Sequence, residues 1–535
     1  MPSVPDFSAD YETFDHATHA FYQKELSVKD YKGISGGFGS YAERGALSSM
    51  LRLRMPGGCI SREKLSFMAD AVKRFQIQRV HFTTCQTVQL HGLSEQTVLT
   101  LAHEALAHGI ITRGGGGDFP RNVTVSPLSG VSDADYFDVL PWALVVSDYL
   151  MGFVDGPKMP RKLKVGFSGG PKNATHATYR DLGFAARPDG TFDVYSAGGL
   201  GQNPRFGVKV AEAAVPENLL YYVKAMYELF RAHGNYENRG KARTRYMQES
   251  LGGPEKYQEA FVEQLKQVQA EEQDSLRLDR NEVLSVYGKD AAAVLQKAAS
   301  LTEAERTASP CFDAQEARRI SAQLQHGLYA VSYHPIGGSP SPDIFQRLLD
   351  ATAGMQGILF RLTPEEGLFI LNLTAAEAKA LIAATPDSAQ TLFETSVACI
   401  GASICQQGLR DSQAALHHLT DAMRAQGFAD GILPQIHISG CPSSCGTHQT
   451  GVIGLRGAAK VVDKKPKSAF LLTYGGDSEV GKEKMGAELG VILEDDLPAF
   501  FTALGTAVSK SGLSFADWAL QNPNGVAELA LPFLG

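Results

Sequence analysis

Two stretches near opposite ends of the chain follow the same plan of strand, turn, helix and strand. Residues 50–93 begin with the alternating pattern of a strand, break at a Pro-Gly-Gly turn, continue as a helical stretch and end in a second alternating strand. Residues 328–373 repeat this order. The repeat predicts two similar half-domains related by a pseudo-twofold axis. A chance likeness between two α/β units would give the same pattern.

Four of the seven cysteines lie close together in the last third of the chain. Cys399 and Cys405 occur in CIGASIC, and Cys441 and Cys445 occur in GCPSSCG. Four thiolates are the ligands that a cubane iron–sulfur cluster needs, because soft sulfur binds iron tightly. Glycine and proline flank the second pair, which allows the backbone to turn closely around a cluster. The pattern favours a [4Fe–4S] cluster.

Three other roles for these cysteines remain open. A structural zinc site usually has about two residues between the cysteines of a pair, and C-x5-C fits this poorly. Disulfides need an oxidising compartment, of which the sequence gives no sign. Unligated cysteines pack as small apolar side chains, which is the role we expect for Cys59, Cys85 and Cys311.

The composition predicts a large water-soluble protein of several domains. The chain has 535 residues, of which 44% are hydrophobic and 20% are charged, as in ordinary globular proteins. A net charge of −8 argues against a general nucleic-acid binder. The first residues are polar and acidic, so we expect no secretory signal, and no stretch is typical of a membrane span. We therefore expect a cytoplasmic protein.

The repeats divide the chain into six predicted segments. Each repeat is followed by a longer region with its own strands and helices, and a charged, Ala- and Gln-rich stretch connects the two halves. The expected boundaries are an N-terminal extension (1–45), a first half-domain (46–115), a first larger domain (118–290), a helical connector (291–322), a second half-domain (323–388) and a second larger domain (391–535).

Eight short motifs occur along the chain in a characteristic order. They are MLRLRMPGG, TTCQTVQLHG, GDFPRNVT, MPRKLK, AGGLG, NRGKARTRY, CIGASIC and GCPSSCG. Through them, nearly the whole chain resembles the sulfite and nitrite reductase family that contains siroheme and a [4Fe–4S] cluster. The resemblance implies an α+β fold, with two ferredoxin-like half-domains forming one pseudo-twofold domain. It further implies two larger α/β domains, of which 118–290 binds siroheme and 391–535 binds the cluster and siroheme.

The resemblance also assigns roles to particular residues. The four paired cysteines would ligate the cluster, and Cys445 would also bridge to the siroheme iron. An oxyanion under reduction needs positive charge and proton donors, which Arg and Lys supply. The matching cations are Arg52, Arg121, Lys162 and Lys164. On a strand, Lys162 and Lys164 would point to the same face, although such a basic pair can also lie on a solvated surface.

Siroheme carries many carboxylates, so an outer shell of cations and polar groups is expected around it. NRGKARTR is also typical of a solvated helix end, AGGLG of an ordinary turn and His91 of a packed core histidine, and we assign no iron ligation to His91. The residues that the resemblance implies for cofactor binding are Arg54, Gln86, Gln89, His91, Asn122, Arg161, Gly198, Gly199, Gly201, Arg239, Lys241, Arg243 and Arg245.

One position departs from the family pattern. The family usually has arginine in a TTRQ motif that contacts siroheme, whereas this chain has Cys85. Either another cation compensates or the macrocycle sits differently. We expect a neutral packing role for Cys85, with a reactive thiol as the alternative.

The expected reaction is the six-electron reduction of sulfite to sulfide. Lys162 and Lys164 together resemble sulfite reductases, because nitrite reductases often have Asn at the second position. The CIGASICQQG stretch leans towards nitrite reductases, so reduction of nitrite to ammonia is the alternative, and a non-catalytic electron-transfer subunit with siroheme and the cluster is the second alternative. No flavin- or nicotinamide-binding domain is evident, so we expect a separate electron donor, either ferredoxin or a flavoprotein.

Overall fold

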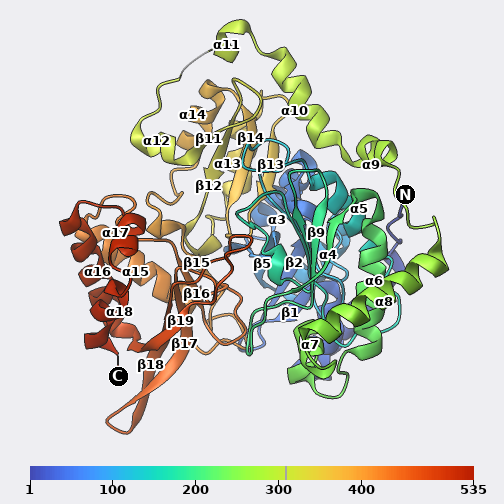
Figure 1. Cartoon of the computed structure of the whole chain (residues 1–535), viewed down its shortest axis with the longest axis horizontal. Helices are drawn as coiled ribbons and strands as arrows, with labels where there is room; N and C mark the ends of the chain where they lie inside the picture. Colours follow the sequence, from blue (N-terminus) through green and yellow to red (C-terminus); the bar gives the residue numbers. More distant parts are fainter. Residues whose placement is uncertain (308–309, 535) are drawn as a thin grey trace. The chain divides into compact units, whose positions relative to one another are not determined.

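The computed structural model describes residues 1–307 and 310–534 and has an α+β architecture (Figure 1). The chain forms two compact units. The first consists of Met1–Gly199, Pro204–Tyr333 and Ser341–Pro386, and the second of Leu200–Asn203, His334–Pro340 and the described residues from Asp387 onwards. Among the described residues, none of the helices combines the length and the apolar character needed to span a bilayer.

The first repeat forms a four-stranded antiparallel sheet in the order β1-β2-β5-β4. Ser61 and Ser94 cap its two helices, each accepting a hydrogen bond from the third residue that follows. The elements are β1 (Ser40–Ala42), β2 (Ser49–Arg54), β4 (Arg79–Phe82), β5 (Thr87–Leu93), α3 (Arg62–Arg74) and α4 (Glu95–Ala107).

The second repeat forms a sheet in the order β11-β12-β14-β13-β3. Its own elements are β11 (Ile320–Ala322), β12 (Tyr329–Tyr333), β13 (Leu359–Leu362), β14 (Leu368–Leu373), α13 (Ile344–Ala351) and α14 (Ala375–Ala384). The fifth strand, β3 (Cys59–Ile60), comes from the first repeat and pairs with β13. Corresponding helices α3 and α13 pack against each other. Both repeats contribute to a single hydrophobic core.

The internal repeat is confirmed at the level of single residues. Gly57 and Gly58 have φ of 63° and 74°, and the residues 280 positions later, Gly337 and Gly338, have φ of 58° and 67°. These left-handed conformations favour glycine. A side chain at Gly58 would also meet the Leu362 carbonyl oxygen at 2.7 Å. The same shift of 280 superimposes β1 on β11.

Each half-domain begins one strand earlier than expected from the sequence. Strand β1 lies in the segment expected as an N-terminal extension, and β11 lies in the expected connector. Both are three-residue edge strands, too short to show an alternating pattern. The expected extension also contains α1 (Tyr11–Tyr22) and α2 (Val28–Ser35). The described part of the expected connector contains most of α10 (Lys289–Ser300), α11 (Glu303–Thr307) and α12 (Ala314–Arg319).

The first larger domain is built on the five-stranded sheet β10-β9-β8-β7-β6. Strands β6, β7 and β8 are parallel, whereas β9 and β10 continue the sheet antiparallel. Helices α5, α6 and α8 bury their apolar sides in its core. The bounds are β6 (Thr124–Val125), β7 (Val165–Ser168), β8 (Leu182–Ala186), β9 (Phe192–Ser196), β10 (Val208–Ala214), α5 (Leu140–Met151), α6 (Leu219–His233), α7 (Met247–Ser250), α8 (Pro254–Glu272) and α9 (Arg280–Tyr287).

The second unit repeats this sheet plan. Strands β15, β16 and β17 are parallel, and β18 and β19 continue antiparallel. The ends of β17 and β18 extend beyond their neighbours as a two-stranded hairpin (Figure 1). The bounds are β15 (Val397–Ala398), β16 (Ile436–Ser439), β17 (Ile453–Val462), β18 (Lys465–Tyr474), β19 (Ala487–Leu493), α15 (Ser412–Gln426), α16 (Leu497–Ser511), α17 (Phe515–Gln521) and α18 (Gly525–Ala530).

The two larger domains share a loop that sequence reasoning missed. From Ser168, the last residue of β7, the chain reads SGGPKN. From Ser439, the last residue of β16 and 271 positions later, it reads SGCPSS. Asn173 donates its backbone N–H to the Gly170 carbonyl (3.3 Å), and Ser444 donates to Cys441 in the same way (3.4 Å). Asn173 and Ser444 both have left-handed φ, of 51° and 55°. The loop that carries the second cysteine pair therefore has a counterpart without cysteines.

Candidate functional site

The loop between β4 and β5 lies where three cation-bearing segments meet. Asn122 Nδ2 donates to the carbonyl oxygens of Cys85 (3.0 Å) and Gln86 (3.1 Å), which fixes the loop against the GDFPRN segment. The backbone N–H of Arg121 in turn donates to the Leu163 carbonyl (2.8 Å), between the two lysines of RKLK. Strand β2 lies beside β5, and there Arg52 is paired with Gln89. Backbone pairing thus brings the three motifs together.

Two arginines converge on one carbonyl group in this region. Arg52 Nη1 and Arg121 Nη1 both donate to the Gly115 carbonyl oxygen, at 2.7 and 2.8 Å. Arg121 Nη2 also donates to the Gly117 carbonyl (2.8 Å). Burial and the nearby charge of Arg52 both lower the pKa of Arg121, although Tyr41 opposes this. Closely spaced, poorly hydrated cations of this kind favour an anion between them.

Several cations act electrostatically on Cys85. Burial alone would raise the pKa of this thiol, but neighbouring positive charges outweigh burial and lower it to about 6. The positive charges that lower the pKa of Cys85 belong, strongest first, to Lys164, Arg180, Arg52 and Lys162. Cys85 in turn raises the pKa of Arg121. All four cations predicted for the substrate site therefore interact electrostatically with this thiol. We define Arg52, Arg121, Lys162, Lys164 and Arg180 as the cation cluster.

Sequence reasoning missed two members of this region. Arg180 follows a short turn in the first larger domain, and its Nε donates to the Thr175 carbonyl (2.7 Å). Tyr41 on β1 accepts a hydrogen bond from the Gly117 N–H (2.8 Å). Burial would raise the pKa of Tyr41, but Arg121 and Arg52 outweigh it and lower the pKa. Neither residue lies in a motif with a recognisable spacing.

Two carboxylates, the partly buried Asp118 and the fully buried Asp181, organise the outer arginines. Asp118 binds both Arg161 (2.7 Å) and Arg239 (2.8 Å). Asp181, which is fully buried, accepts two contacts from Arg243 Nη2 (2.9 Å each).

Asp181 also connects the outer arginines to the cation cluster, because it accepts the backbone N–H of Lys164 (2.8 Å). Nearby, Arg245 is buried, and its guanidinium lies 4.8 Å from the ring centre of Tyr246. Lys241 is exposed and pairs with Glu249 at 3.5 Å.

Several predicted cofactor contacts are engaged in local structure. Gln86 donates to the carbonyls of Val125 (2.9 Å) and Leu362 (2.6 Å), so it joins the two repeats to β6. His91 is buried and pairs with Glu43 at 2.8 Å. Gln89 lies 3.8 Å from the Met50 sulfur.

Arg54 is also buried, and it donates to the Pro120 carbonyl (3.0 Å). Burial, followed by the charge of Arg121, lowers the pKa of Arg54 to about 9.

The AGGLG glycines fall on both sides of the division between the units. Gly198 and Gly199 belong to the first unit and Gly201 to the second. A side chain at Gly198 would meet the Tyr179 backbone at 2.6 Å, which explains the glycine there by backbone packing. In the second unit, the Gly201 carbonyl accepts a hydrogen bond from Gln449 (3.1 Å).

The two cysteine pairs follow adjacent parallel strands. Cys399 comes directly after β15, and Cys441 follows β16 after one glycine. Because the carboxyl ends of parallel strands meet at one edge of a sheet, the two loops lie together. The Cys399 N–H donates to the Ile438 carbonyl (3.2 Å), and the Gly440 N–H donates to the Cys399 sulfur (3.2 Å).

Cys399 and Cys445 are close enough for their charges to interact. Burial, followed by the charge of Cys445, raises the pKa of Cys399 to about 12. Cys445 is exposed, whereas Cys405 and Cys441 are partly buried. Within residues 1–307 and 310–534, no three His, Cys, Asp or Glu side chains are grouped closely enough to hold one metal ion. A cubane cluster makes a weaker demand, because each thiolate binds a different iron atom.

The donor groups fit the cofactors that the resemblance implies. A backbone N–H directed at a cysteine sulfur, as from Gly440, is typical of iron–sulfur sites. In the first unit, the buried Nε atoms of Arg121 and Arg243 have no hydrogen-bond partner among the described residues. Such unpaired donors suit a cofactor with several carboxylates.

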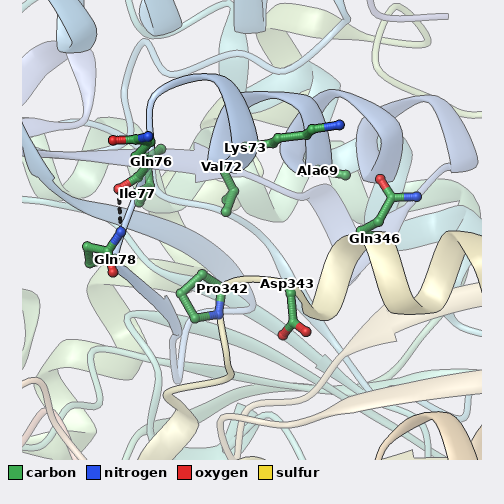
Figure 2. A pocket seen from close by; sticks show the side chains of 9 residues that line it. All are labelled: Ala69, Val72, Lys73, Gln76, Ile77, Gln78, Pro342, Asp343 and Gln346. Atoms are coloured by element: carbon green, nitrogen blue, oxygen red, sulfur yellow. Dashed lines mark hydrogen bonds between the residues drawn. The ribbon is translucent and has the colours of Figure 1, made fainter.

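A pocket of about 640 Å³ lies away from these residues, beside α3 and α13 (Figure 2). Figure 2 shows Lys73 on α3 and Asp343 just before α13 at its border. Its lining residues are Ala69, Val72, Lys73, Gln76, Ile77, Gln78, Pro342, Asp343 and Gln346, none of which is a predicted site residue.

Two family models match the chain. One, described as the nitrite and sulphite reductase 4Fe-4S domain, matches residues 116–268, a segment that ends before all four paired cysteines. The other, described as the nitrite/sulfite reductase ferredoxin-like half domain, matches residues 42–108.

Known proteins resemble the chain over most of its length. It is 28% identical over 469 residues to the ferredoxin–nitrite reductase of Synechococcus elongatus, covering 83% of each chain. It is 25% identical over 471 residues to the ferredoxin sulfite reductase of Mycobacterium tuberculosis, covering 83% of this chain and 74% of that one. The solved structure of the Mycobacterium tuberculosis NirA protein has the same fold, with a TM-score of 0.75, 22% identity and coverage of 96% and 94%.

Proposed function

Because this chain belongs to the sulfite and nitrite reductase family that contains siroheme and a [4Fe–4S] cluster, we propose that it reduces sulfite to sulfide with six electrons. Its cofactors, siroheme and the cluster, supply the iron that accepts the oxyanion and the path for the electrons. The observation that carries the proposal is the meeting of three cation-bearing segments: Arg52 and Arg121 share the Gly115 carbonyl, and the Arg121 backbone is hydrogen-bonded to Leu163, between Lys162 and Lys164.

In this proposal the cation cluster binds and protonates the substrate. Arg52 and Arg121 are held in place by the Gly115 carbonyl and offer their remaining N–H groups to the oxyanion. Lys162 and Lys164 carry protons on flexible stems and deliver them to the oxygens that leave as water. Fixed positive charges stabilise the negative charge that builds up during reduction.

The cofactor ligands follow from the same proposal. Cys399, Cys405, Cys441 and Cys445 would hold the cluster, and Cys445 would in addition connect it with the siroheme iron. The siroheme carboxylates are bound by the outer arginines and by the polar and glycine residues that the motifs assign. Because Asp118 and Asp181 already pair with three of these arginines, they hold the guanidinium groups in place for the cofactor.

Sulfite is favoured because two ammonium groups lie in the cluster. A dianion with three oxygens gains more from two such charges than a monoanion does. Nitrite is the second candidate, since relatives of this chain include ferredoxin–nitrite reductases. The names of both kinds of relative also support ferredoxin as the electron donor.

Turnover of both anions by the holoenzyme with reduced ferredoxin tests the proposal. Lys164→Asn should lower kcat/KM for sulfite about 100-fold. It should lower kcat/KM for nitrite only about tenfold. Lys158→Asn, at an exposed lysine of the same segment, is the matched control and should leave both values unchanged.

Two results would count against the proposal. Nitrite turnover with negligible sulfite turnover would overturn the choice of sulfite. Absence of turnover on either anion, in protein that contains both cofactors, would instead favour the electron-transfer subunit.

A further inference from the structure

The hairpin formed by the ends of β17 and β18 extends past the other strands of its sheet (Figure 1). The last residue of β16 pairs with Arg456, and the last residue of β19 pairs with Ala469. Among the described residues, those at 458–468 pair only with each other, and we call them the protruding hairpin. Strand β17 continues for six residues beyond Arg456, which at about 3.3 Å per residue carries the hairpin about 20 Å past β16.

The protruding hairpin is strongly basic in a chain whose net charge is −8. It contains four lysines and one aspartate, which together give a net charge of +3. Three acidic residues, Glu494–Asp496, follow β19 at the base of the hairpin. Even so, none of the four lysine side chains forms an ion pair within the part of the chain that the structure describes. The lysines are Lys460, Lys464, Lys465 and Lys467.

Three of these lysines share one face of the hairpin. Residues directly opposite each other in an antiparallel pair lie on the same face, and so do alternate residues of one strand. The register places Lys460 opposite Lys467, and Val462 opposite Lys465. Val462 therefore lies among three lysines, and we define these four residues as the lysine face. An apolar residue within a polar rim is the usual arrangement of a protein–protein interface.

Two features of the hairpin work against its own stability. Like charges directly opposite each other on a sheet are destabilising, and Lys460 and Lys467 are such a pair. At the turn, Asp463 and Lys464 both have left-handed φ, of 50° and 61°. Glycine is the usual residue at the second position of such a turn, so lysine is strained there. Stability of the fold does not explain these lysines, which favours a role towards a partner.

The base of the hairpin adjoins the loops that carry the paired cysteines. Strand β17 runs parallel to β16, so the hairpin rises from the same edge of the sheet as these loops. A side chain at Gly457 would collide with the carbonyl group of Gly440, the residue before Cys441. The same carbonyl accepts the N–H of Leu409 (3.0 Å), four residues after Cys405. A partner that approaches the cysteine loops along this edge therefore meets the positive charge of the hairpin.

We propose that the lysine face is a docking site for the electron donor, and that this donor is a small protein with an acidic surface. The inference rests on the proposed function, in which a separate protein supplies the electrons. Carboxylates of the donor pair with Lys460, Lys465 and Lys467, and an apolar side chain of the donor covers Val462. Because the chain as a whole is acidic, it repels such a donor elsewhere, and the hairpin decides where the donor docks.

Binding of an acidic ferredoxin to the oxidised holoenzyme, measured by calorimetry, tests the proposal without turnover. Ferredoxin is the probe because it is the donor in the names of relatives of this chain. The wild type should bind it about tenfold more tightly at about 20 mM salt than at about 200 mM, because salt screens the charges. Lys460→Gln/Lys467→Gln should weaken binding about tenfold at the lower salt concentration and reduce the salt dependence.

The opposite face of the same hairpin supplies the matched control. Ala459 and Ser468 are exposed and lie directly opposite each other on that face. Ala459→Glu/Ser468→Glu lowers the net charge as much as the glutamine variant does, and it should weaken binding less than about threefold. Hydrogen exchange of the backbone amides checks that each variant keeps the hairpin. If the glutamine variant loses it, Lys467→Glu replaces that variant, since glutamate opposite Lys460 favours the pairing and still removes positive charge.

The outcomes separate this inference from the proposed function. Equal affinity of the wild type and the glutamine variant would overturn the inference, and this is the result expected of lysines that only protect an edge strand. Equal weakening by both double variants, or no ferredoxin binding to the wild type, would also overturn it. Loss of binding to a DNA duplex, with ferredoxin binding unchanged, would assign the lysine face to a nucleic acid. Only failure of the holoenzyme to reduce either anion with a chemical reductant would contradict the proposed function itself.

Discussion

Asp181 is predicted to be essential for the stability of the first unit. Its fully buried carboxylate accepts hydrogen bonds from Arg243, from the Lys164 backbone and from the Thr244 hydroxyl group. In Asp181→Asn the shape is kept, but the charge of Arg243 loses its partner, and an amide N–H₂ faces a guanidinium group. Removing one partner of a buried ion pair costs about 3–5 kcal/mol of unfolding free energy.

The pH dependence of this effect has a definite sign. Burial would raise the pKa of Asp181, but Arg243 and the hydrogen bonds outweigh it, so the folded pKa lies below the ordinary value. A carboxyl with a lowered pKa stabilises the fold above its unfolded pKa of about 3.9, and this contribution is lost as the pH falls through the folded pKa. The difference between wild type and variant should therefore be constant from neutral pH to about pH 5 and shrink in stronger acid.

Tryptophan fluorescence can report on this unit alone. The chain has two tryptophans, Trp142 in the core of the first larger domain and Trp518 in the second unit. In a Trp518→Phe background, urea unfolding followed through Trp142 should show the predicted loss. Asp133→Asn, at an exposed position, is the control and should change the free energy by less than about 0.5 kcal/mol. Wild-type stability of Asp181→Asn at neutral pH would refute the reasoning.

Two further predictions concern the paired larger domains. In the first, Cys441 is replaced by Gly and Cys445 by Ala, which are the residues at the matching positions of the counterpart loop. This change should abolish cluster absorbance and leave the circular dichroism spectrum unchanged. Loss of folded structure would show that the loop needs its metal. Gly183→Ala should destabilise the first unit by at least about 1–3 kcal/mol in the Trp142 assay, because the added carbon would lie 1.8 Å from the Ala177 carbonyl oxygen. Gly354→Ala, where nothing lies within 4 Å, should have little effect, and equal effects of the two would contradict the packing argument.

The sequence predicted the half-domain repeat because both copies contain long alternating strands and a glycine turn. It missed β1 and β11, since three residues are too few to show a pattern. It also missed the loop shared by the larger domains, where only the S-G-x-P letters persist. That loop is instead defined by its backbone conformation, which depends on packing against the strand before it.

The candidate site was predicted as far as its residues lie in motifs. Tyr41 and Arg180 lie outside them, and only the folded chain brings them to the cluster. A neutral packing role was expected for Cys85, and no sequence pattern indicated that neighbouring positive charges would lower the pKa of its thiol. An effect that depends on charges from several segments of the chain cannot be predicted from local sequence.

In the proposed reaction this chain uses siroheme and its cluster to reduce an oxyanion by six electrons. The most direct test counts the electrons taken from reduced ferredoxin for each product molecule released by the purified holoenzyme. We expect six electrons per sulfide formed from sulfite, with visible bands of both cofactors in the same protein. A colourless protein that contains zinc, or electron consumption without sulfide or ammonia, would contradict it.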